Sequence, residues 1–392
     1  MTKVVLPGST IGVLGGGQLG RMMALAGAHM GYRFVTLDPT PDAPCGQVSA
    51  AQIVAAYDDR AAARELARSA DVITYEFENV DSGVARMLEQ ESYVPQGSRL
   101  LHTTQHRLRE KRAVEEAGVR VAPYRQVGSE KDLLDAVDLL GTPCVLKTAT
   151  GGYDGKGQRV LHSEDEAEAA FAELFGPGVD LVLERFIDFE KELSVIAART
   201  PDGEAAAFPA AENVHVDNIL HLSIVPARVP QEVQEKATEM ALSVAESLGV
   251  AGLVAVEMFW AGGDELYVNE LAPRPHNSGH YTIEACVTSQ FEQHVRAICN
   301  LPLGPTTLLT PAVMVNVLGE HLEPLIRLIE KGGMRSRGGV TPKVHVYGKA
   351  ESRPKRKMGH VTPVADDVDP ALAWIEEAGI WEGQVAKTGP VR

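Results

Sequence analysis

The chain has 392 residues, with 53 acidic against 37 basic residues and a formal net charge of −16. This excess of carboxylates argues against general binding to nucleic acids or anionic membranes, because such a surface repels phosphate polymers. With 44% hydrophobic and 23% charged residues, the composition is that of a globular protein of two or three domains, and it excludes disordered and fibrous chains.

The cysteines and the first residues predict the compartment. Cys45, Cys144, Cys286 and Cys299 form no C-x-x-C pair, which fits reduced thiols better than a disulfide framework or a zinc site. The opening residues lack the apolar core of a signal peptide, and no apolar stretch approaches membrane-spanning length. We therefore expect a cytoplasmic protein with neither a membrane nor a nucleic-acid partner.

Residues 1–110 are predicted to form a lobe with a parallel sheet. Short apolar runs alternate with helical stretches, which is typical of βαβ units. We expect strands at 11–14, 33–38, 53–56 and 72–75, a helix from the first glycine turn to about Met30, and a helix over 60–68.

The pattern changes near residue 110, where a charged helix over 105–117 leads through Gly118 into shorter strands. We place a central lobe at 111–190 and a larger C-terminal lobe with a mixed sheet at 191–392, so the fold class is α/β and α+β. The expected strands are 144–148, 158–161, 181–185, 193–197, 253–260 and 266–269, and the expected helices are 164–175 and 231–248.

The first candidate site is the turn GGGQLG at 15–20, which satisfies G-x-G-x-x-G between a strand and a helix. Asp38 ends the next strand, where an acidic side chain can bond a ribose hydroxyl. Taken alone, this motif favours NAD or FAD. The same backbone donors would equally serve a single phosphate or a polar group of another substrate.

A second glycine-rich stretch, TATGGYDGKG at 148–157, follows a strand that ends in Lys147. Such a loop can fold its N–H groups over a polyphosphate, with lysines as counter-charges. It is not a Walker loop, because Gln158 rather than a hydroxyl residue follows the last glycine, so magnesium must be held elsewhere. The alternative is a flexible connection between two strands.

Two glutamates on a predicted hairpin supply the missing metal site. A two-residue turn at 262–263 places Glu257 opposite Val268 and puts Glu270 on the diagonal of the same face, roughly 7–8 Å away. Two carboxylates can share magnesium, which completes its shell with phosphate oxygens, and Asn269 adds a neutral ligand if the strand is bulged. The alternative is the solvated face of an edge hairpin.

Two further features surround this hairpin. The loop LAPRPHNSGH after it is stiffened by two prolines around Arg274 and places His276 and Asn277 beside the carboxylates; a salt-paired structural arginine is the alternative. A basic cluster near the C-terminus suggests a pocket for a phosphate monoester, or alternatively a nucleic-acid or nuclear-localisation patch. It consists of Lys343, Lys349, Arg353, Lys355, Arg356 and Lys357.

Taken together, these motifs resemble the ATP-grasp superfamily and, within it, the family of 5-(carboxyamino)imidazole ribonucleotide synthases of purine biosynthesis. The resemblance runs over nearly the whole chain in the expected order. It is carried by GGGQLGRM at 15–22, TYEFENV at 74–80, GGYDGKGQ at 151–158, VEMF at 256–259, VNELAPRPHNSGHYT at 268–282, YGK at 347–349 and KRKMGH at 355–360.

The resemblance implies an ATP-grasp fold whose N-terminal Rossmann-like lobe binds aminoimidazole ribonucleotide rather than NAD, which reverses the interpretation of the first glycine turn. It implies ATP and Mg²⁺ as cofactors, bicarbonate as a second substrate, and a homodimer. The implied reaction carboxylates the ribonucleotide through carboxyphosphate, giving the carboxyamino product, ADP and phosphate.

The resemblance also assigns residues to three sites. ATP would contact Arg107, Lys147, Gly152, Tyr153, Asp154, Gly155, Lys156, Gly157, Gln158, Glu184, Arg185, Phe186, Ile187, Glu192, His215, Asn269 and Glu270, and Glu257 and Glu270 would hold magnesium. The ribonucleotide would contact Gln18, Leu19, Glu76, His276, Asn277, Lys349, Arg356 and Lys357. The catalytic candidates near the reacting carbonate are Tyr153, Asp154, Lys156 and Arg274.

Three alternatives stay open at this point. An NAD-dependent oxidoreductase explains the first glycine turn and Asp38 but leaves the carboxylate hairpin unexplained. Another ATP-grasp ligase, such as the formate-using glycinamide ribonucleotide transformylase or a relative of biotin carboxylase, shares the chemistry with a different acceptor. A non-enzymatic binding module predicts no ATP hydrolysis with any substrate.

Overall fold

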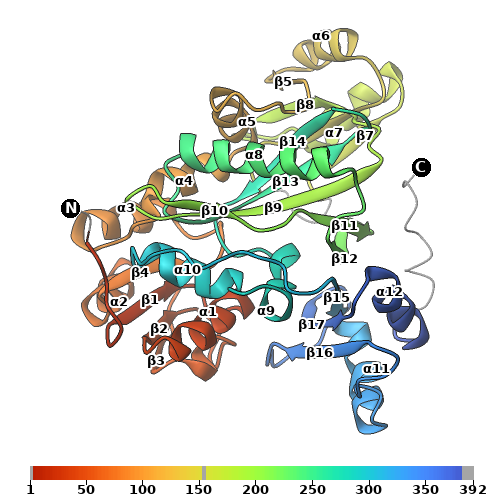
Figure 1. Ribbon diagram of the computed structural model, residues 1–392. Helices are drawn as coiled ribbons and strands as arrows, with labels where there is room; N and C mark the ends of the chain where they lie inside the picture. Colours follow the sequence, from red (N-terminus) through yellow and green to blue (C-terminus); the bar gives the residue numbers. More distant parts are fainter. Residues whose placement is uncertain (1–2, 152–155, 382–392) are drawn as a thin grey trace.

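The computed structural model describes residues 3–151 and 156–381, which form three sheets with helices packed against them (Figure 1). The N-terminal sheet has four parallel strands in the order β3-β2-β1-β4, which confirms the predicted parallel lobe. The strand expected at 53–56 lies earlier in the chain. The elements are β1 (Thr10–Leu14), α1 (Gln18–His29), β2 (Arg33–Leu37), η1 (Gly46–Val48), β3 (Ala51–Ile53), α2 (Arg60–Ser69), β4 (Val72–Tyr75), α3 (Ser82–Glu91) and α4 (Gly97–Thr104).

The central sheet is antiparallel, in the order β5-β8-β6-β7, and α6 and α7 share its apolar core. Its three predicted strands have the expected bounds, and the helix expected over 164–175 divides into a short 3₁₀ turn and an α-helix. The elements are α5 (Arg107–Glu116), β5 (Tyr124–Val127), α6 (Glu130–Leu140), β6 (Cys144–Thr148), β7 (Gln158–Leu161), η2 (Glu164–Glu166), α7 (Ala167–Leu174) and β8 (Leu181–Arg185).

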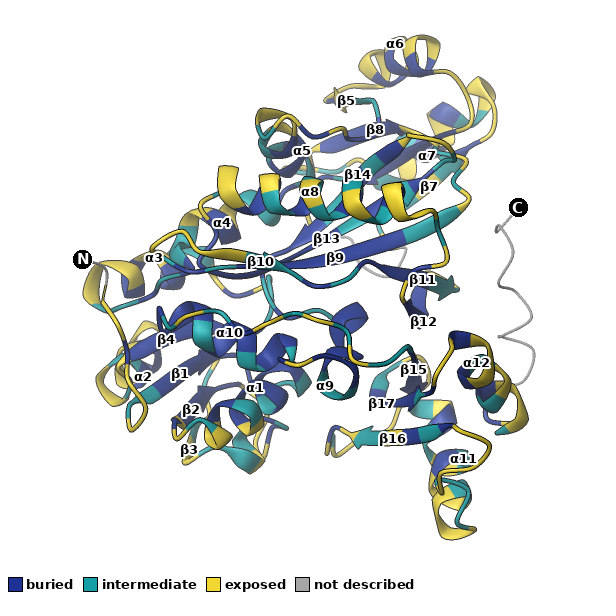
Figure 2. Cartoon of the chain, viewed as in Figure 1, coloured by how far each residue is buried: buried dark blue, intermediate teal, exposed yellow. Residues whose placement is uncertain are grey.

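The largest sheet runs in the order β14-β13-β9-β11-β12-β15-β17-β16, with β10 paired to β9. Strands β13 and β9, near one end of this order, are largely buried, and α8 covers them with an exposed outer face (Figure 2). The elements are β9 (Lys191–Arg199), β10 (Ala205–Ala207), β11 (Ala211–Val216), β12 (Ile219–Val225), α8 (Gln231–Ser247), β13 (Gly252–Trp260), β14 (Leu266–Ala272), η3 (Asn277–Gly279), α9 (Thr282–Ala285), α10 (Gln290–Ile298), β15 (Ala312–Leu318), α11 (Gly319–Glu330), β16 (Thr341–Val346), β17 (Lys357–Val364) and α12 (Val368–Glu377).

One helix of the C-terminal part packs against the N-terminal lobe. Phe291 and Val295 of α10 share an apolar core with Leu19 and Met23 of α1. This contact places the loop between β14 and α10 beside the first glycine turn. The division into lobes at 1–110, 111–190 and 191–392 stays a prediction. Within the part of the chain that the structure describes, no helix combines the length and apolar character needed to cross a bilayer.

Candidate active site

The two hairpin glutamates lie directly opposite each other. Strands β13 and β14 pair Met258 with Val268, and the register then shifts so that Glu257 faces Glu270. The predicted pairing of Glu257 with Val268 and the diagonal placement of Glu270 were therefore wrong. The shift is a bulge that leaves Asn269 as the extra residue beside the carboxylate pair.

The turn of this hairpin also differs from the expected two-residue turn. The N–H of Ala261 donates to the carbonyl of Glu265 at 3.0 Å, which makes the connection one residue longer. Gly262 and Gly263 adopt φ angles of 94° and 53°, a region that glycine enters without steric cost. The longer turn starts the change of register that the bulge completes.

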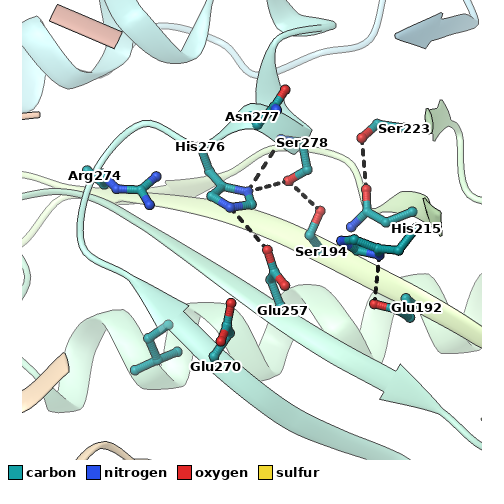
Figure 3. Close-up of polar contacts among 12 residues, drawn as sticks. Glu192, Ser194, His215, Ser223, Glu257, Glu270, Arg274, His276, Asn277 and Ser278 are labelled. Atoms are coloured by element: carbon teal, nitrogen blue, oxygen red, sulfur yellow. Dashed lines mark hydrogen bonds and ion pairs between the residues drawn. The ribbon is translucent and has the colours of Figure 1, made fainter. Parts of the chain in front are cut away.

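The surroundings of the two carboxylates favour a cation bound between them. Burial raises the pKa of Glu257, and the neighbouring charge of Glu270 raises it further. Arg107 Nη1 lies 3.5 Å from Glu270 Oε2. His276 Nε2 lies 3.1 Å from Glu257 Oε1 (Figure 3). Paired oxygen ligands with the amide of Asn269 nearby fit magnesium. No group of three or more His, Cys, Asp or Glu among residues 3–151 and 156–381 is arranged to hold a metal, so the remaining ligands would be phosphate or water oxygens.

These glutamates line a cavity of about 680 Å³ enclosed by strands of the central and the largest sheet, with Glu78 and Asn79, which follow β4, closing it on the side of the N-terminal lobe. Most of the predicted nucleotide residues line it, and so do the metal candidates and three of the predicted substrate residues. They are Arg107, Lys147, Lys156, Gln158, Glu184, Arg185, Phe186, Ile187, Glu192, His215, Glu257, Asn269, Glu270, Arg274, His276, Asn277 and Lys357. Gly157 immediately precedes β7, and its carbonyl accepts from the N–H of Thr148 at 2.8 Å. Gly152, Tyr153, Asp154 and Gly155 lie outside the described residues.

The central-lobe wall of the cavity carries a buried ion triplet. Glu184 Oε2 lies 2.9 Å from Lys147 Nζ and 3.2 Å from Lys111 Nζ. Burial alone would raise the pKa of Glu184, but the two ammonium groups outweigh burial and lower this pKa to about 2. On the opposite wall, His215 Nδ1 lies 3.0 Å from Glu192 Oε2 (Figure 3).

The first glycine turn is filled by the protein's own carboxylates. Asp38 Oδ2 accepts from the N–H of Gly16 at 2.8 Å, and the Glu76 carboxylate accepts from Gly17 and Gly20. Asp38 also accepts from the hydroxyl of Tyr57. A pyrophosphate therefore has neither these donors nor a free Asp38, which contradicts the dinucleotide interpretation. Burial raises the pKa of Glu76 to about 7.

Four predicted substrate residues lie at or near this turn rather than in the large cavity: Gln18, Leu19, Glu76 and Lys349. Arg356 does not line the cavity either. Gln18 and Leu19 begin α1. Lys349 Nζ donates to the carbonyl of Lys357 at 2.7 Å, and the carbonyl of Gly348 accepts from Gln47 at 2.8 Å. Burial and the nearby charge of Arg356 lower the pKa of Lys349 to about 8. This lysine therefore lies between Glu76, whose charge acts on it, and Lys357 at the cavity.

The six basic residues near the C-terminus do not converge on one point. Lys349 and Lys357 turn inward, whereas Lys343 is exposed. Arg353 pairs with Glu351, and Lys355 lies 3.2 Å from Asp217, both at the surface. Arg356 donates to the carbonyl of Glu351 at 2.8 Å. The six residues therefore do not form one pocket, and contact with a substrate phosphate stays a prediction.

Comparison with known proteins identifies the family. The N5-carboxyaminoimidazole ribonucleotide synthase of Bacillus subtilis (strain 168) is 49% identical to this chain over 375 residues, which are 96% of each chain. The chain belongs to the N5-carboxyaminoimidazole ribonucleotide synthase family. Three domain families match consecutive segments: the ribonucleotide synthetase preATP-grasp domain at 8–105, the ATP-grasp domain at 112–291 and the phosphoribosylaminoimidazole carboxylase C-terminal domain at 312–373.

Solved structures of the synthase family agree with this fold. An N5-carboxyaminoimidazole ribonucleotide synthetase in complex with ADP is 52% identical to this chain, with a TM-score of 0.93. The match covers 98% of this chain and 100% of that one. The Aspergillus clavatus synthase in complex with ADP and 5-aminoimidazole ribonucleotide is 32% identical with a TM-score of 0.86, over 94% of this chain and 97% of that one. The predicted ATP-grasp fold is confirmed.

The sequence analysis missed three charged residues of this synthase-family site. Glu78 holds Arg274 through a two-pronged ion pair, with 2.9 Å between Arg274 Nη2 and Glu78 Oε1. Glu110 and Lys111 come from α5, where their spacing with Arg107 repeats at i, i+3 and i+4. Both are almost fully buried. Charged residues at this spacing on one face of a predicted helix are the signal that would have found them.

Proposed function

We propose that this chain catalyses the ATP-dependent carboxylation of 5-aminoimidazole ribonucleotide with bicarbonate, giving N5-carboxyaminoimidazole ribonucleotide, ADP and phosphate in de novo purine biosynthesis. The observation that carries this proposal is the pairing of Glu257 with Glu270 inside a cavity lined by cations, in a chain of this family. An ATP-grasp carbon–nitrogen ligase needs such a site to bring a metal-bound triphosphate to a small anion.

The nucleotide half of the cavity is proposed to lie between the central and the largest sheet. The backbone of 184–187 would read the adenine, and Glu192, which lies against His215, would meet the ribose. Arg107 and Lys147 bring positive charge to the phosphates, and Lys147 is held in place by Glu184. The glycine-rich stretch before Gln158 would close over the triphosphate.

Glu257 and Glu270 are proposed to hold Mg²⁺, with Asn269 beside them. When bound, magnesium neutralises the charge that develops between the β- and γ-phosphates during transfer. The two strands fix the carboxylates in advance, because cross-strand pairing leaves them little freedom. Positioning of charge, rather than proton transfer, is what these residues would contribute to the first step.

The carbonate half of the cavity is proposed to lie near Arg274, whose guanidinium is aimed by Glu78. An oxygen of bicarbonate would attack the γ-phosphorus, and the bond from that phosphorus to the bridging oxygen of ADP would break. The exocyclic amine would then attack the carbon of carboxyphosphate, breaking its bond to the phosphate oxygen, or the carbon of CO₂ formed when that same bond breaks first. Phosphate leaves in either case, and the amine nitrogen gives up one proton. Tyr153, Asp154 and Lys156 stay candidates for this half. Exclusion of water protects carboxyphosphate from hydrolysis.

Release of ADP measured with one component omitted at a time tests the proposal. We expect rapid ADP release only when ATP, magnesium, bicarbonate and 5-aminoimidazole ribonucleotide are all present. Release that requires formate and glycinamide ribonucleotide instead would assign another ATP-grasp ligase, and no release with any mixture would leave a binding module. The cytoplasmic location and the homodimer also remain predictions, and sedimentation of the purified chain tests the second.

A further inference from the structure

Four polar side chains, those of Ser194, Ser278, His276 and Glu257, form a continuous chain of contacts that ends at the carboxylate pair (Figure 3). Ser194 on β9 is the cross-strand neighbour of Glu257 on β13. Ser194 Oγ donates to Ser278 Oγ at 2.8 Å, and Ser278 Oγ lies 2.9 Å from His276 Nδ1. His276 Nε2 then lies 3.1 Å from Glu257 Oε1. The chain leaves one strand, crosses the turn η3 and returns to the adjacent strand.

The geometry fixes which ring nitrogen of His276 carries the proton. The backbone N–H of Ser278 also points at Nδ1, at 3.4 Å, and a backbone N–H can only donate. Because Ser278 Oγ accepts from Ser194, its own hydroxyl proton is available to Nδ1 as well. Nδ1 is therefore the acceptor, and the proton of the ring is on Nε2, facing Glu257.

Packing alone does not require hydroxyl groups at these two serines. Ser194 and Ser278 are 2% and 0% exposed, and the neighbours of Ser194 along β9 are the fully buried Leu193 and Val195. A buried hydroxyl costs free energy unless it is hydrogen-bonded, whereas alanine fits such a strand without that cost. The role left for the two serine hydroxyls is to complete the chain of contacts to His276.

We propose that Ser194 and Ser278 are positioning residues that hold His276 as the Nε2–H tautomer, so that the ring donates to one oxygen of Glu257 and leaves the other for the cation. The opposite tautomer would aim a ring lone pair at the carboxylate, and the two would repel. This inference rests on the proposed function, because it gives Glu257 a defined orientation toward the metal.

The test compares Ser278→Ala and Ser194→Ala with a matched control, Ser223→Ala. Ser223 on β12 is also fully buried, and its hydroxyl donates to Asn213 at 2.9 Å rather than to the chain that includes His276. The primary readout is the ¹⁵N spectrum of the ring nitrogens in the histidine-labelled full-length chain without nucleotide or metal. The His276 signals are assigned by their loss in His276→Gln.

We expect the wild type to show a protonated Nε2 and an unprotonated Nδ1 for His276. Ser278→Ala and Ser194→Ala should shift both signals toward a mixture of tautomers, and Ser223→Ala should leave them in place. In turnover, Ser278→Ala should lower kcat about fivefold while the KM for ATP stays nearly constant, since one neutral hydrogen bond is lost.

A wild type with the proton on Nδ1, or serine variants with unchanged ring signals, would overturn this inference. Both results leave ADP release by the wild type intact, so they are separate from the proposed function. If the complete substrate mixture yields no ADP with the wild type, the proposed function fails, whatever the ring spectrum shows.

Discussion

The buried triplet of Glu184, Lys111 and Lys147 makes a prediction whose size follows from the structure. The exposed fractions of these side chains are 4%, 2% and 11%. Replacing Glu184 by Gln would leave two ammonium groups buried with no carboxylate, which costs about 3–5 kcal/mol. Lys111→Met should cost far less, because it leaves one neutral pair and an apolar side chain in place of the second cation.

The pKa of Glu184 gives a second route to the same magnitude. Burial raises this pKa, but the two lysines outweigh burial, and the fall from 4.5 to about 2 corresponds to about 3 kcal/mol, part of which is offset because burial lowers the pKa of Lys147. Because the pKa is lower in the folded chain, this stabilisation is fully present above about pH 4.5 and is lost as the pH falls toward 2. The cost of removing the carboxylate and the shift of its pKa therefore both put the contribution of Glu184 at a few kcal/mol.

Native-state hydrogen exchange of the β6 and β8 amides measures the opening of the central lobe directly. Glu184→Gln should speed this exchange at least about a hundredfold at neutral pH. Asp135→Asn is the control, since it breaks an exposed pair with Lys131 in the same lobe and should change the opening free energy by at most about 0.5 kcal/mol. Exchange in Glu184→Gln no faster than in this control would refute the reasoning.

Three further predictions concern the substrates. Glu270→Gln should reduce magnesium-dependent turnover at least about a hundredfold with an unchanged circular dichroism spectrum, because one metal ligand is lost; near wild-type turnover would remove the metal assignment. Arg356→Ala should raise the KM for the ribonucleotide far more than the KM for ATP, and equal effects would count against contact with the substrate phosphate. Because the pKa of Lys349 falls to about 8, its positive charge is lost above that pH. The KM for the ribonucleotide should therefore rise above pH 8 in the wild type, and Lys349→Met should lose this pH dependence.

Several strands could be predicted because the residues in and next to each strand mark its ends. Strands β4, β6, β7 and β8 have the expected bounds. Strands β4, β6 and β8 are short, mainly apolar runs, whereas β7 is half polar and directly follows the glycine-rich stretch that marks its start. Strand β3 was misplaced because the apolar run beyond it continues into an exposed segment. The bounds of β11, β12 and β15–β17 were not predicted, since buried polar residues such as Asn213 and Asn316 interrupt their apolar pattern.

The register of the β13–β14 hairpin could not be predicted from the hairpin itself. The N–H of Leu271, next to the bulge, donates to Glu110 Oε2 at 3.1 Å, and Glu110 lies 161 residues earlier in the chain. A contact over that separation has no local signal. The residue types of the site were predictable, because each lies in a local motif. The ion pairs between distant residues, such as Glu78 with Arg274, were not predictable.

The central claim is that Glu257 and Glu270 hold a cation that joins the protein to the phosphates of the nucleotide. Titration calorimetry of ADP with and without magnesium, in the wild type, Glu257→Gln and Glu270→Gln, tests it most directly. We predict that magnesium tightens ADP binding to the wild type at least about tenfold and that either substitution removes this gain while leaving magnesium-free binding unchanged. A full magnesium effect in either variant would contradict the claim.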